Sequence, residues 1–381
     1  MIPFNKPYLH GKELVYIADA VASGKIAGDG AFTQRCHRFF ERRYGIGKAL
    51  LTTPCTDALE MCALLLDIKD GDEVILPSFT FVSTANAFAM RGAKLVFADC
   101  CADNPNVSAD EIESLISPRT RAIVVVHYAG VACDMRRIGA IAERYAVPII
   151  EDAAHAVEAT WEGKPLGTLG ALAAFSFHET KNIISGEGGM LAINDSRYIR
   201  RAEIIREKGT NRSAFFRGEV DKYNWVDIGS SYLPSDIVAA YLYAQIEVIE
   251  TIQARRIAIW ERYNNAFSSL EKWGIHRPVV AGWGSNNGHM YYLVMPSLDL
   301  RAAYIEAMRR EGVVAVFHYQ PLHASPYYAE RHDGRLLPNC MRYSDSLVRL
   351  PLFYEITDNQ QDHVIEATFR VLEGLIGSSD Y

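Results

Sequence analysis

A single lysine, Lys181, lies in the stretch SFHETKNIISGEGG (residues 176–189), between a serine and a group of glycines. Glycines allow a backbone to turn sharply or to approach another group closely. One chemistry that needs a lysine in such a setting is the formation of a Schiff base with pyridoxal phosphate (PLP). The ordinary alternative is a solvated surface lysine. The stretch therefore predicts that Lys181 binds this cofactor, provided that other residues meet the cofactor's remaining demands.

The first demand is a carboxylate beside the pyridine nitrogen, because the ring accepts electrons only when that nitrogen is protonated. Asp152 ends the apolar run VPIIED and is placed for this role. A carboxylate and a cation at close range favour each other's charged forms, so Asp152 would raise the pKa of the ring nitrogen. Helix capping is the alternative role for Asp152. Its pairing with Lys181 favours the functional interpretation.

The other demands are a phosphate cradle and an aromatic cover for the ring. Thr56 and Asp57 lie at a predicted strand-to-helix turn in PCTDALEM, where free N–H groups and the helix dipole favour an anion. Ser176 could donate its hydroxyl to the same phosphate. For the cover, PSFTFVST offers Phe79 and Phe81. Helix capping and core packing are the alternatives for these two groups of residues.

These residues follow apolar runs that alternate with helical patterns. The runs are KALLTT, DEVILP, AKLVFAD, TRAIVVVHY and VPIIED. The alternation predicts an α/β fold with a mainly parallel sheet, whose ligands bind at the carboxyl ends of the strands. Two further predicted strands, 171–177 and 189–193, flank the loop of Lys181.

The rest of the chain indicates a second, smaller α/β region. A long helix-favouring segment spans about 235–272. It is followed by a predicted strand near 289–295 and by predicted helices near 300–311 and 359–374. We therefore expect a large PLP-binding domain over residues 1–250, which includes the N-terminal segment, and a small C-terminal domain over residues 251–381.

Composition excludes several classes of protein. The 381 residues carry a net charge of −7, which gives no sign of nucleic acid as a partner. None of the seven cysteines is spaced as CxxC, so we expect no metal centre and no disulfide framework, as in a reducing cytosol. The N-terminus lacks the apolar core of a signal peptide, and no apolar run approaches the roughly 18 residues of a membrane span. The expected location is the cytoplasm, with no membrane contact.

Several motifs together resemble one family, the sugar aminotransferases of the DegT/DnrJ/EryC1/StrS type. They are PSFTFVSTANA, VHYAG, EDAAHA, SFHETKN with GEGG, and HYQPLH, in order from residue 77 to 323. The resemblance implies the PLP-dependent aspartate aminotransferase fold (fold type I). It also implies transamination between L-glutamate and a nucleotide-linked keto-sugar, in a homodimer whose active sites are completed by the partner subunit.

The resemblance also assigns roles to individual residues. Lys181 is implied as the Schiff-base lysine, and Asp152 as the partner of the pyridine nitrogen. Ser176, Thr56 and Asp57 are implied to hold the phosphate, and Phe81 to cover the ring. Two positions depart from the usual pattern: His155 stands where glutamine often contacts the phenolic oxygen, and Ser231 stands where an asparagine would reach the partner's phosphate.

The substrate is the least determined part. Stretches such as EIIREKGTNR, FFRGEVDKY and DIGSSYL resemble members that aminate C4 of a dTDP-linked 6-deoxysugar for enterobacterial common antigen. A 3-keto or GDP-linked sugar is the alternative. Residues that could shape the sugar site are His127, Tyr128, Tyr319 and His323, and candidates for the diphosphate are Arg206, Lys208, Arg212 and Arg217.

Two alternative functions are consistent with parts of the sequence. A sugar 3-dehydratase of the same fold has histidine in place of the lysine, so Lys181 argues against it. A PLP-binding regulatory protein would not need Lys181, Asp152 and Ser176 together. The sequence thus favours a transaminase over both.

Overall fold

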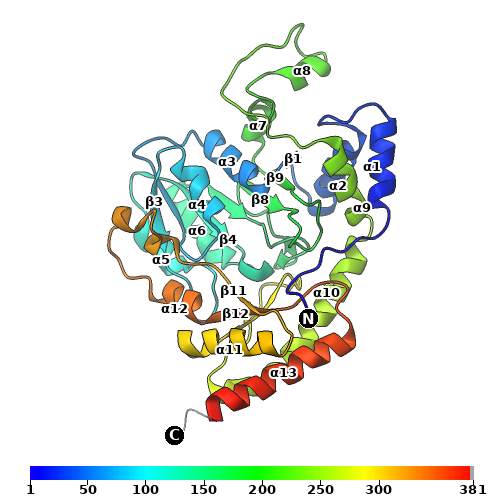
Figure 1. The fold of residues 1–381 in the computed structure, drawn as a ribbon. Helices are drawn as coiled ribbons and strands as arrows, with labels where there is room; N and C mark the ends of the chain where they lie inside the picture. Colours follow the sequence, from blue (N-terminus) through cyan, green and yellow to red (C-terminus); the bar gives the residue numbers. More distant parts are fainter. Residues whose placement is uncertain (378–381) are drawn as a thin grey trace.

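The predicted strands form a seven-stranded sheet in the computed structural model, which describes residues 1–377 (Figure 1). Across the sheet the order is β1 (Lys48–Thr52), β9 (Gly189–Ile193), β8 (Leu172–Ser176), β5 (Ile149–Asp152), β4 (Thr120–Val126), β2 (Glu73–Pro77) and β3 (Lys94–Ala98). Strand β9 is antiparallel to both of its neighbours, and the other pairs are parallel. The prediction of an α/β fold with a mainly parallel sheet is confirmed.

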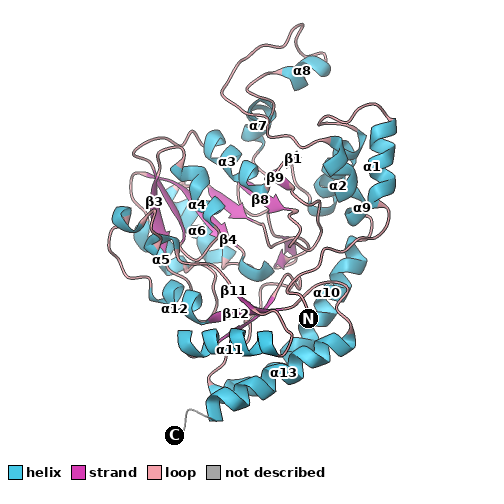
Figure 2. Ribbon diagram, viewed as in Figure 1, coloured by secondary structure: helices cyan, strands magenta, loops and turns pink. Residues whose placement is uncertain are grey.

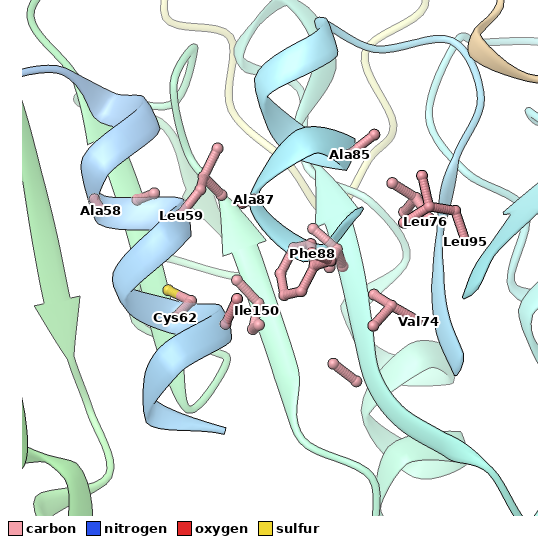
Figure 3. Packing of buried hydrophobic residues seen from close by; sticks show 14 of the residues in the cluster. Ala58, Leu59, Cys62, Val74, Leu76, Ala85, Ala87, Phe88, Leu95 and Ile150 are labelled. Atoms are coloured by element: carbon pink, nitrogen blue, oxygen red, sulfur yellow. The ribbon is translucent and has the colours of Figure 1, made fainter. Parts of the chain in front are cut away.

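Helices cover both faces of this sheet because alternate strand residues point to opposite sides. In β2, Val74 and Leu76 pack against α3 (Cys55–Leu65) and α4 (Val82–Ala89), as Figure 3 shows. The intervening Ile75 belongs to a different cluster, on the opposite face. That face is covered by α5 (Ala109–Leu115) and α6 (Met135–Tyr145) at one end, and by α2 (Ala31–Tyr44) and α9 (Asp236–Ile246) at the other.

A second, three-stranded antiparallel sheet lies below the first in Figure 1. Its order is β10 (Tyr291–Val294), β12 (Leu347–Leu350) and β11 (Val316–Phe317). The helices of this part of the chain are α10 (Ile249–Ala266), α11 (Leu298–Arg310), α12 (Pro338–Ser346) and α13 (Asp358–Gly377). Its apolar cluster also contains Ile2, which pairs with Val313, so the N-terminal segment reaches this second unit.

The segment predicted as one long helix over 235–272 is divided in the structure. Helix α9 ends at Ile246, α10 begins at Ile249, and a 3₁₀ helix, η3 (Phe267–Trp273), follows. Val248, with φ −118°, separates the first two helices, and no glycine or proline marks this break in the sequence. The predicted domain boundary at residue 250 lies next to the start of α10, and residues 378–381 of the predicted C-terminal domain lie outside the described residues.

The remaining elements are peripheral to the two sheets. They are α1 (Glu13–Ala22), α7 (Ile199–Arg206), α8 (Arg212–Phe216), the hairpin β6 (Thr160–Trp161) and β7 (Lys164–Pro165), and the 3₁₀ turns η1 (Tyr128–Gly130), η2 (Ser196–Tyr198), η4 (Leu322–Ala324) and η5 (Ala329–Arg331). Helix α8 sits on an excursion that projects from the body of the molecule, and most of the excursion is loop (Figure 2). Within residues 1–377, every helix is too short or too polar to cross a membrane.

Candidate active site

A cavity of about 1030 Å³ lies at the carboxyl ends of β4, β5 and β8. The first turns of α3 and α4 and the loop between β8 and β9 form part of its wall. The second unit contributes residues 316–320, 349, 350 and 352, and the N-terminal segment contributes Phe4 and Asn5. The carboxyl-end edge of the sheet therefore holds the cavity, as predicted for an open α/β sheet.

Lys181 lines this cavity from the loop between β8 and β9. Its backbone N–H donates to the His178 carbonyl at 2.9 Å, and Gly186, with φ +83°, closes the loop by accepting from the Glu179 N–H. Burial lowers the pKa of Lys181 to about 8, although Cys55 and Asp152 oppose the shift. Near neutral pH the amine can therefore exist both with and without its proton.

Asp152 ends β5 and is buried in the wall of the same cavity. Thr84 Oγ1 donates to Asp152 Oδ2 at 2.7 Å, and the Ala154 N–H donates to Oδ1 at 3.2 Å. Because the single Thr84 proton points at Asp152, the hydroxyl of Thr80 must donate to Thr84. Burial raises the pKa of Asp152, and these hydrogen bonds oppose the shift. The carboxylate is thus held in one orientation with acceptor capacity left for a cation in the cavity.

An anion cradle lies at the N-terminus of α3. The Thr56 hydroxyl is 2.8 Å from Ser83 Oγ of α4, and both residues line the cavity together with Ser176. Strand β9 approaches this turn closely: a Cβ placed on Gly189 would lie 2.4 Å from the Cys55 nitrogen. Only glycine therefore allows β9 to pair with β8 here and leaves the first-turn N–H groups of α3 in place.

His155 lies between the cavity and a group of aromatic residues. Its Nδ1 accepts from the Ala129 N–H at 3.3 Å, so Nε2 carries the proton and faces the Tyr319 hydroxyl at 3.3 Å. Burial, together with the charges of Lys181 and Arg349, holds the pKa of His155 well below its usual range. The ring is thus neutral and presents a fixed N–H donor.

A layer of packing holds His155 in that position. The His289 ring stacks on it at 4.3 Å between centroids, and His289 Nδ1 donates to the Asn182 side-chain oxygen at 2.8 Å. Asn287 donates to the carbonyls of His155 and Val157 at 2.7 and 2.8 Å. The Asn287 side chain occupies the space that a Cβ on Gly130 would need, and Gly130 has φ +78°. The glycine of the VHYAG motif therefore makes room for a side chain that holds His155.

The structure separates the two phenylalanines proposed as ring cover. Phe81 lines the cavity and is 56 % exposed, whereas Phe79 is 1 % exposed and packs against Tyr128 and Tyr319. Asp57 lies in the first turn of α3 but is not among the residues that line the cavity. Burial and the nearby Glu60 raise the pKa of its carboxyl to about 7. Asp57 can serve an anion through its backbone N–H and not through its side chain.

Ser231 lies outside the cavity of its own chain. It is exposed and forms an isolated bridge with Glu207 at the base of the excursion that carries α8. The candidates for the diphosphate lie outside the cavity as well. Arg206 is buried and paired with Asp29 at 2.8 Å, and Arg217 is paired with Glu203 and Glu219. Lys208 and Arg212 do not line the cavity either.

Of the four residues considered for the sugar site, only Tyr319 lines the cavity. His127 is fully buried and lies 2.9 Å from Glu151, whose other hydrogen bonds hold the backbone of residues 167–170. The Tyr128 hydroxyl lies 2.6 Å from His318 Nδ1, and His323 Nδ1 lies 2.6 Å from the Ser78 hydroxyl. These three residues stabilise the protein around the site.

The cavity residues that the sequence analysis did not assign include Ser83, His289, His318 and Arg349. Ser83 could have been found, because it begins a predicted helix directly after a strand, in the same way as Thr56. His318 begins the HYQPLH motif, which could have pointed to it. His289 and Arg349 come from the second unit and have no such signal. Only the packing of that unit against the large sheet places them at the cavity.

The comparisons with known proteins agree with this geometry. Residues 7–369 match the model of the DegT/DnrJ/EryC1/StrS aminotransferase family. The uncharacterized protein MJ1066 of Methanocaldococcus jannaschii is 32% identical over 379 residues, which cover 97% of each chain. The aminotransferase TlmJ from Streptoalloteichus hindustanus is similar in structure, with 30% identity, a TM-score of 0.91 and coverage of 99% of this chain and 100% of that one. The PLP form of the putative sugar aminotransferase Spr1654 from Streptococcus pneumoniae gives 25% identity, a TM-score of 0.90 and coverage of 98% and 99%.

The chain belongs to the DegT/DnrJ/EryC1/StrS aminotransferase family. It is a PLP-dependent aminotransferase with the fold of that family, and its residues fit the cofactor. One cavity contains a partly buried lysine, an oriented buried carboxylate and an anion cradle. A Cβ at residue 189 would fill that cradle.

The cradle leads to a test at Gly189. We expect Gly189→Ala to weaken PLP binding by about tenfold or more, because the added methyl must displace the Cys55 backbone. Fluorescence titration of the apoenzyme with PLP measures this. Gly139→Ala is the matched control, since a Cβ there meets nothing within 4 Å and alanine favours helix α6. Unchanged PLP affinity in Gly189→Ala would contradict the role of the close approach.

Proposed function

We propose that the enzyme transfers the amino group of L-glutamate to the C4 keto group of dTDP-4-keto-6-deoxy-D-glucose. The products are dTDP-4-amino-4,6-dideoxy-D-galactose and 2-oxoglutarate. The observation that carries the proposal is the placement of Lys181 and Asp152 on the wall of one cavity of about 1030 Å³. That volume is at the upper end for small-molecule sites and leaves room for a sugar beside a cofactor. The similarity to a putative sugar aminotransferase supports this class of substrate.

Each predicted site residue has a proposed role toward the cofactor. Ser176, Thr56 and the first-turn N–H groups of α3, including that of Asp57, would hold the phosphate. Asp152 would keep the pyridine nitrogen protonated. Phe81 would cover the ring, and the Nε2 proton of His155 would be donated to the phenolic oxygen. The proposed covalent link is to Lys181.

PLP supplies an electron sink that lets a bond to the amino-bearing carbon break. The work left to the protein is to move one proton and to exclude water. The Lys181 amine, with a pKa of about 8, can take a proton and return it at physiological pH. The Thr84 hydroxyl and the Ala154 N–H hold Asp152 as an acceptor, and its proposed partner is the pyridine nitrogen. A second lysine is absent from the residues that line the cavity, so Lys181 is the proposed acid and base.

The assignment of Lys181 is tested by borohydride reduction of the holoenzyme and peptide mapping. We expect the pyridoxyl group on Lys181. The rate of its attachment to the apoenzyme should rise with pH up to about 8 and then level off, because the free amine is the nucleophile. Lys181→Ala should bind PLP without a covalent link and lose transamination, whereas Lys164→Ala, an exposed lysine, should behave as wild type. A pyridoxyl group on another lysine would contradict the assignment.

The proposed active unit is a homodimer with shared sites. The excursion around α8 carries large apolar side chains that are exposed in the isolated chain. They are Phe216 (69%), Tyr223 (52%), Trp225 (81%) and Ile228 (50%). Exposed apolar groups of this kind mark interaction surfaces, and Ser231 lies at the base of the same excursion.

Two measurements test the dimer. Sedimentation should show the active enzyme as a dimer, and activity in a monomer would contradict this. Mixing Lys181→Ala subunits with subunits inactivated at residues 229–233 should restore part of the activity, because one site of each mixed dimer is then intact. No recovery on mixing would argue against shared sites.

The substrate is tested by steady-state kinetics with several keto-sugar nucleotides. We expect the highest kcat/KM for dTDP-4-keto-6-deoxy-D-glucose with glutamate, and NMR should identify a galacto-configured 4-amine. An equal or higher kcat/KM for the 3-keto isomer or for GDP-4-keto-6-deoxymannose would change the substrate but not the class of enzyme. A PLP-binding regulatory protein, the remaining alternative, would show no half-reaction with glutamate.

A further inference from the structure

Two cysteines, one from each unit of the chain, meet in the protein interior. Cys100 follows β3 of the large sheet, and Cys340 lies in the first turn of α12. Their sulfur atoms are 3.3 Å apart, although 240 residues separate them in the sequence. Both side chains are buried, with exposures of 1% and 0%. All seven cysteines lie within the described residues and are free thiols, so this pair is reduced in the structure.

The backbone around each of the two cysteines is held in place by hydrogen bonds. The Asp99 carboxylate accepts from the N–H groups of Asn339 and Cys340 at 3.0 and 2.8 Å. The Asn339 side chain donates to the Cys100 carbonyl at 3.0 Å. Both cysteines also belong to one apolar cluster of the large sheet. The fold has therefore already brought the two thiols together, which is the main entropic cost of joining distant residues.

Metal binding and simple packing are the alternatives for two buried thiols. The two sulfurs and a carboxylate oxygen of Asp99 lie within 4.8 Å of one another. However, a structural zinc site takes four ligands, and both Asp99 oxygens already accept backbone N–H groups. Packing explains why the thiols are buried, but it does not require that their sulfurs contact each other. The contact favours a bond between them.

We propose that Cys100 and Cys340 form a reversible disulfide in the presence of hydrogen peroxide, and that this bond locks the second unit onto the large sheet. The sulfurs of a disulfide lie about 2.05 Å apart, so these two must approach by roughly 1.3 Å from their 3.3 Å separation. Helix α12 leads directly into β12, whose Arg349 and Leu350 line the cavity. The bond would therefore hold the segment that brings β12 to the cavity.

The oxidation takes two steps. One cysteine, as the thiolate, attacks an oxygen of hydrogen peroxide; the O–O bond breaks and a sulfenic acid forms. The hydroxide that leaves takes up the proton that the thiol had lost and becomes water. The second thiol then attacks the sulfenic sulfur, so that the S–S bond forms, the S–O bond breaks and a second water leaves. Two thiols are thus oxidised by two electrons, and one peroxide is reduced to two waters.

The surroundings of the pair set how readily it reacts. Because both thiols are buried, a small oxidant such as hydrogen peroxide suits them better than a bulky one. Burial also raises the pKa of Cys100, so little thiolate exists at neutral pH and oxidation should be slow. Once a sulfenic acid forms, the other thiol is already in contact and should react before a second peroxide does. A dithiol reductant should restore both thiols.

The test compares the reduced holoenzyme with the same protein after exposure to hydrogen peroxide, removal of the excess by catalase and alkylation of the remaining thiols in denaturant. Peptide mapping without reductant should find Cys100 joined to Cys340. Oxidation, before alkylation, should raise the unfolding midpoint by about 5 °C, because the bond restricts a loop of 240 residues in the unfolded chain. Dithiothreitol should reverse both changes.

Variants assign these changes to the pair. Cys100→Ser and Cys340→Ala, made separately, should each abolish the linked peptide and the rise in midpoint. The comparison of reduced with oxidised wild type stands even where a variant folds poorly. Cys36→Ala is the matched control, because Cys36 is also a fully buried helical cysteine but its thiol donates to the Ala239 carbonyl at 3.5 Å. It should keep both the link and the rise in midpoint.

Any other outcome contradicts the proposal. Absence of the linked peptide would mean that the two thiols only pack, and sulfinic acids without a link would mean that they react independently. A link through the neighbouring Cys101 would assign the wrong pair. A link that leaves the midpoint unchanged would mean that the bond locks nothing. One equivalent of metal bound to these thiols in the purified protein would make the cluster a metal site.

Discussion

Burial of charge in one cavity is the constraint on which the rest of the site depends. The same removal of water that lowers the pKa of Lys181 to about 8 raises that of Asp152, so each charged group needs support from neighbours. The support for Asp152 is a hydroxyl and a backbone N–H. His155 is the third titratable group of the site. It stays neutral because burial and the nearby charges of Lys181 and Arg349 disfavour its charged form. Chemistry at neutral pH depends on this balance, since a lysine in water would remain protonated.

The geometry of the backbone serves the same cavity. Strand β9 runs against the direction of its neighbours, and its first residue, Gly189, pairs with Ser176 on one side and Thr52 on the other. This places the loop of Lys181 beside the N-terminus of α3, where the backbone N–H groups have no helical partners. A glycine is needed because a Cβ on residue 189 would lie 2.4 Å from the backbone nitrogen of Cys55. Two of the glycines that follow Lys181 are therefore explained, by a turn at Gly186 and a close approach at Gly189.

The sequence predicted the large sheet and the residues at the ends of its strands because these signals are local. Lys181, Asp152, Ser176 and Thr56 each follow or precede a strand within a few residues, and the structure places all four on the cavity wall. The choice of Phe81 over Phe79 came from the family resemblance, because both residues have the same local pattern. The diphosphate candidates rested on charge alone, and Arg206 and Arg217 are instead used in ion pairs. Arg349 and His289 were missed because their positions depend on how the second unit packs.

This division between local and distant signals has a functional counterpart. The large sheet supplies the groups proposed to hold the cofactor and move the proton, and those tasks are common to every aminotransferase. The second unit and the N-terminal segment supply Tyr319, Arg349 and Phe4, which face the space left for substrates. Ile2 joins the N-terminal segment to the second unit through Val313, and both of these residues lie in the apolar cluster of that unit. A change of substrate can therefore arise from substitutions in that unit while the charge balance around Lys181 and Asp152 stays intact.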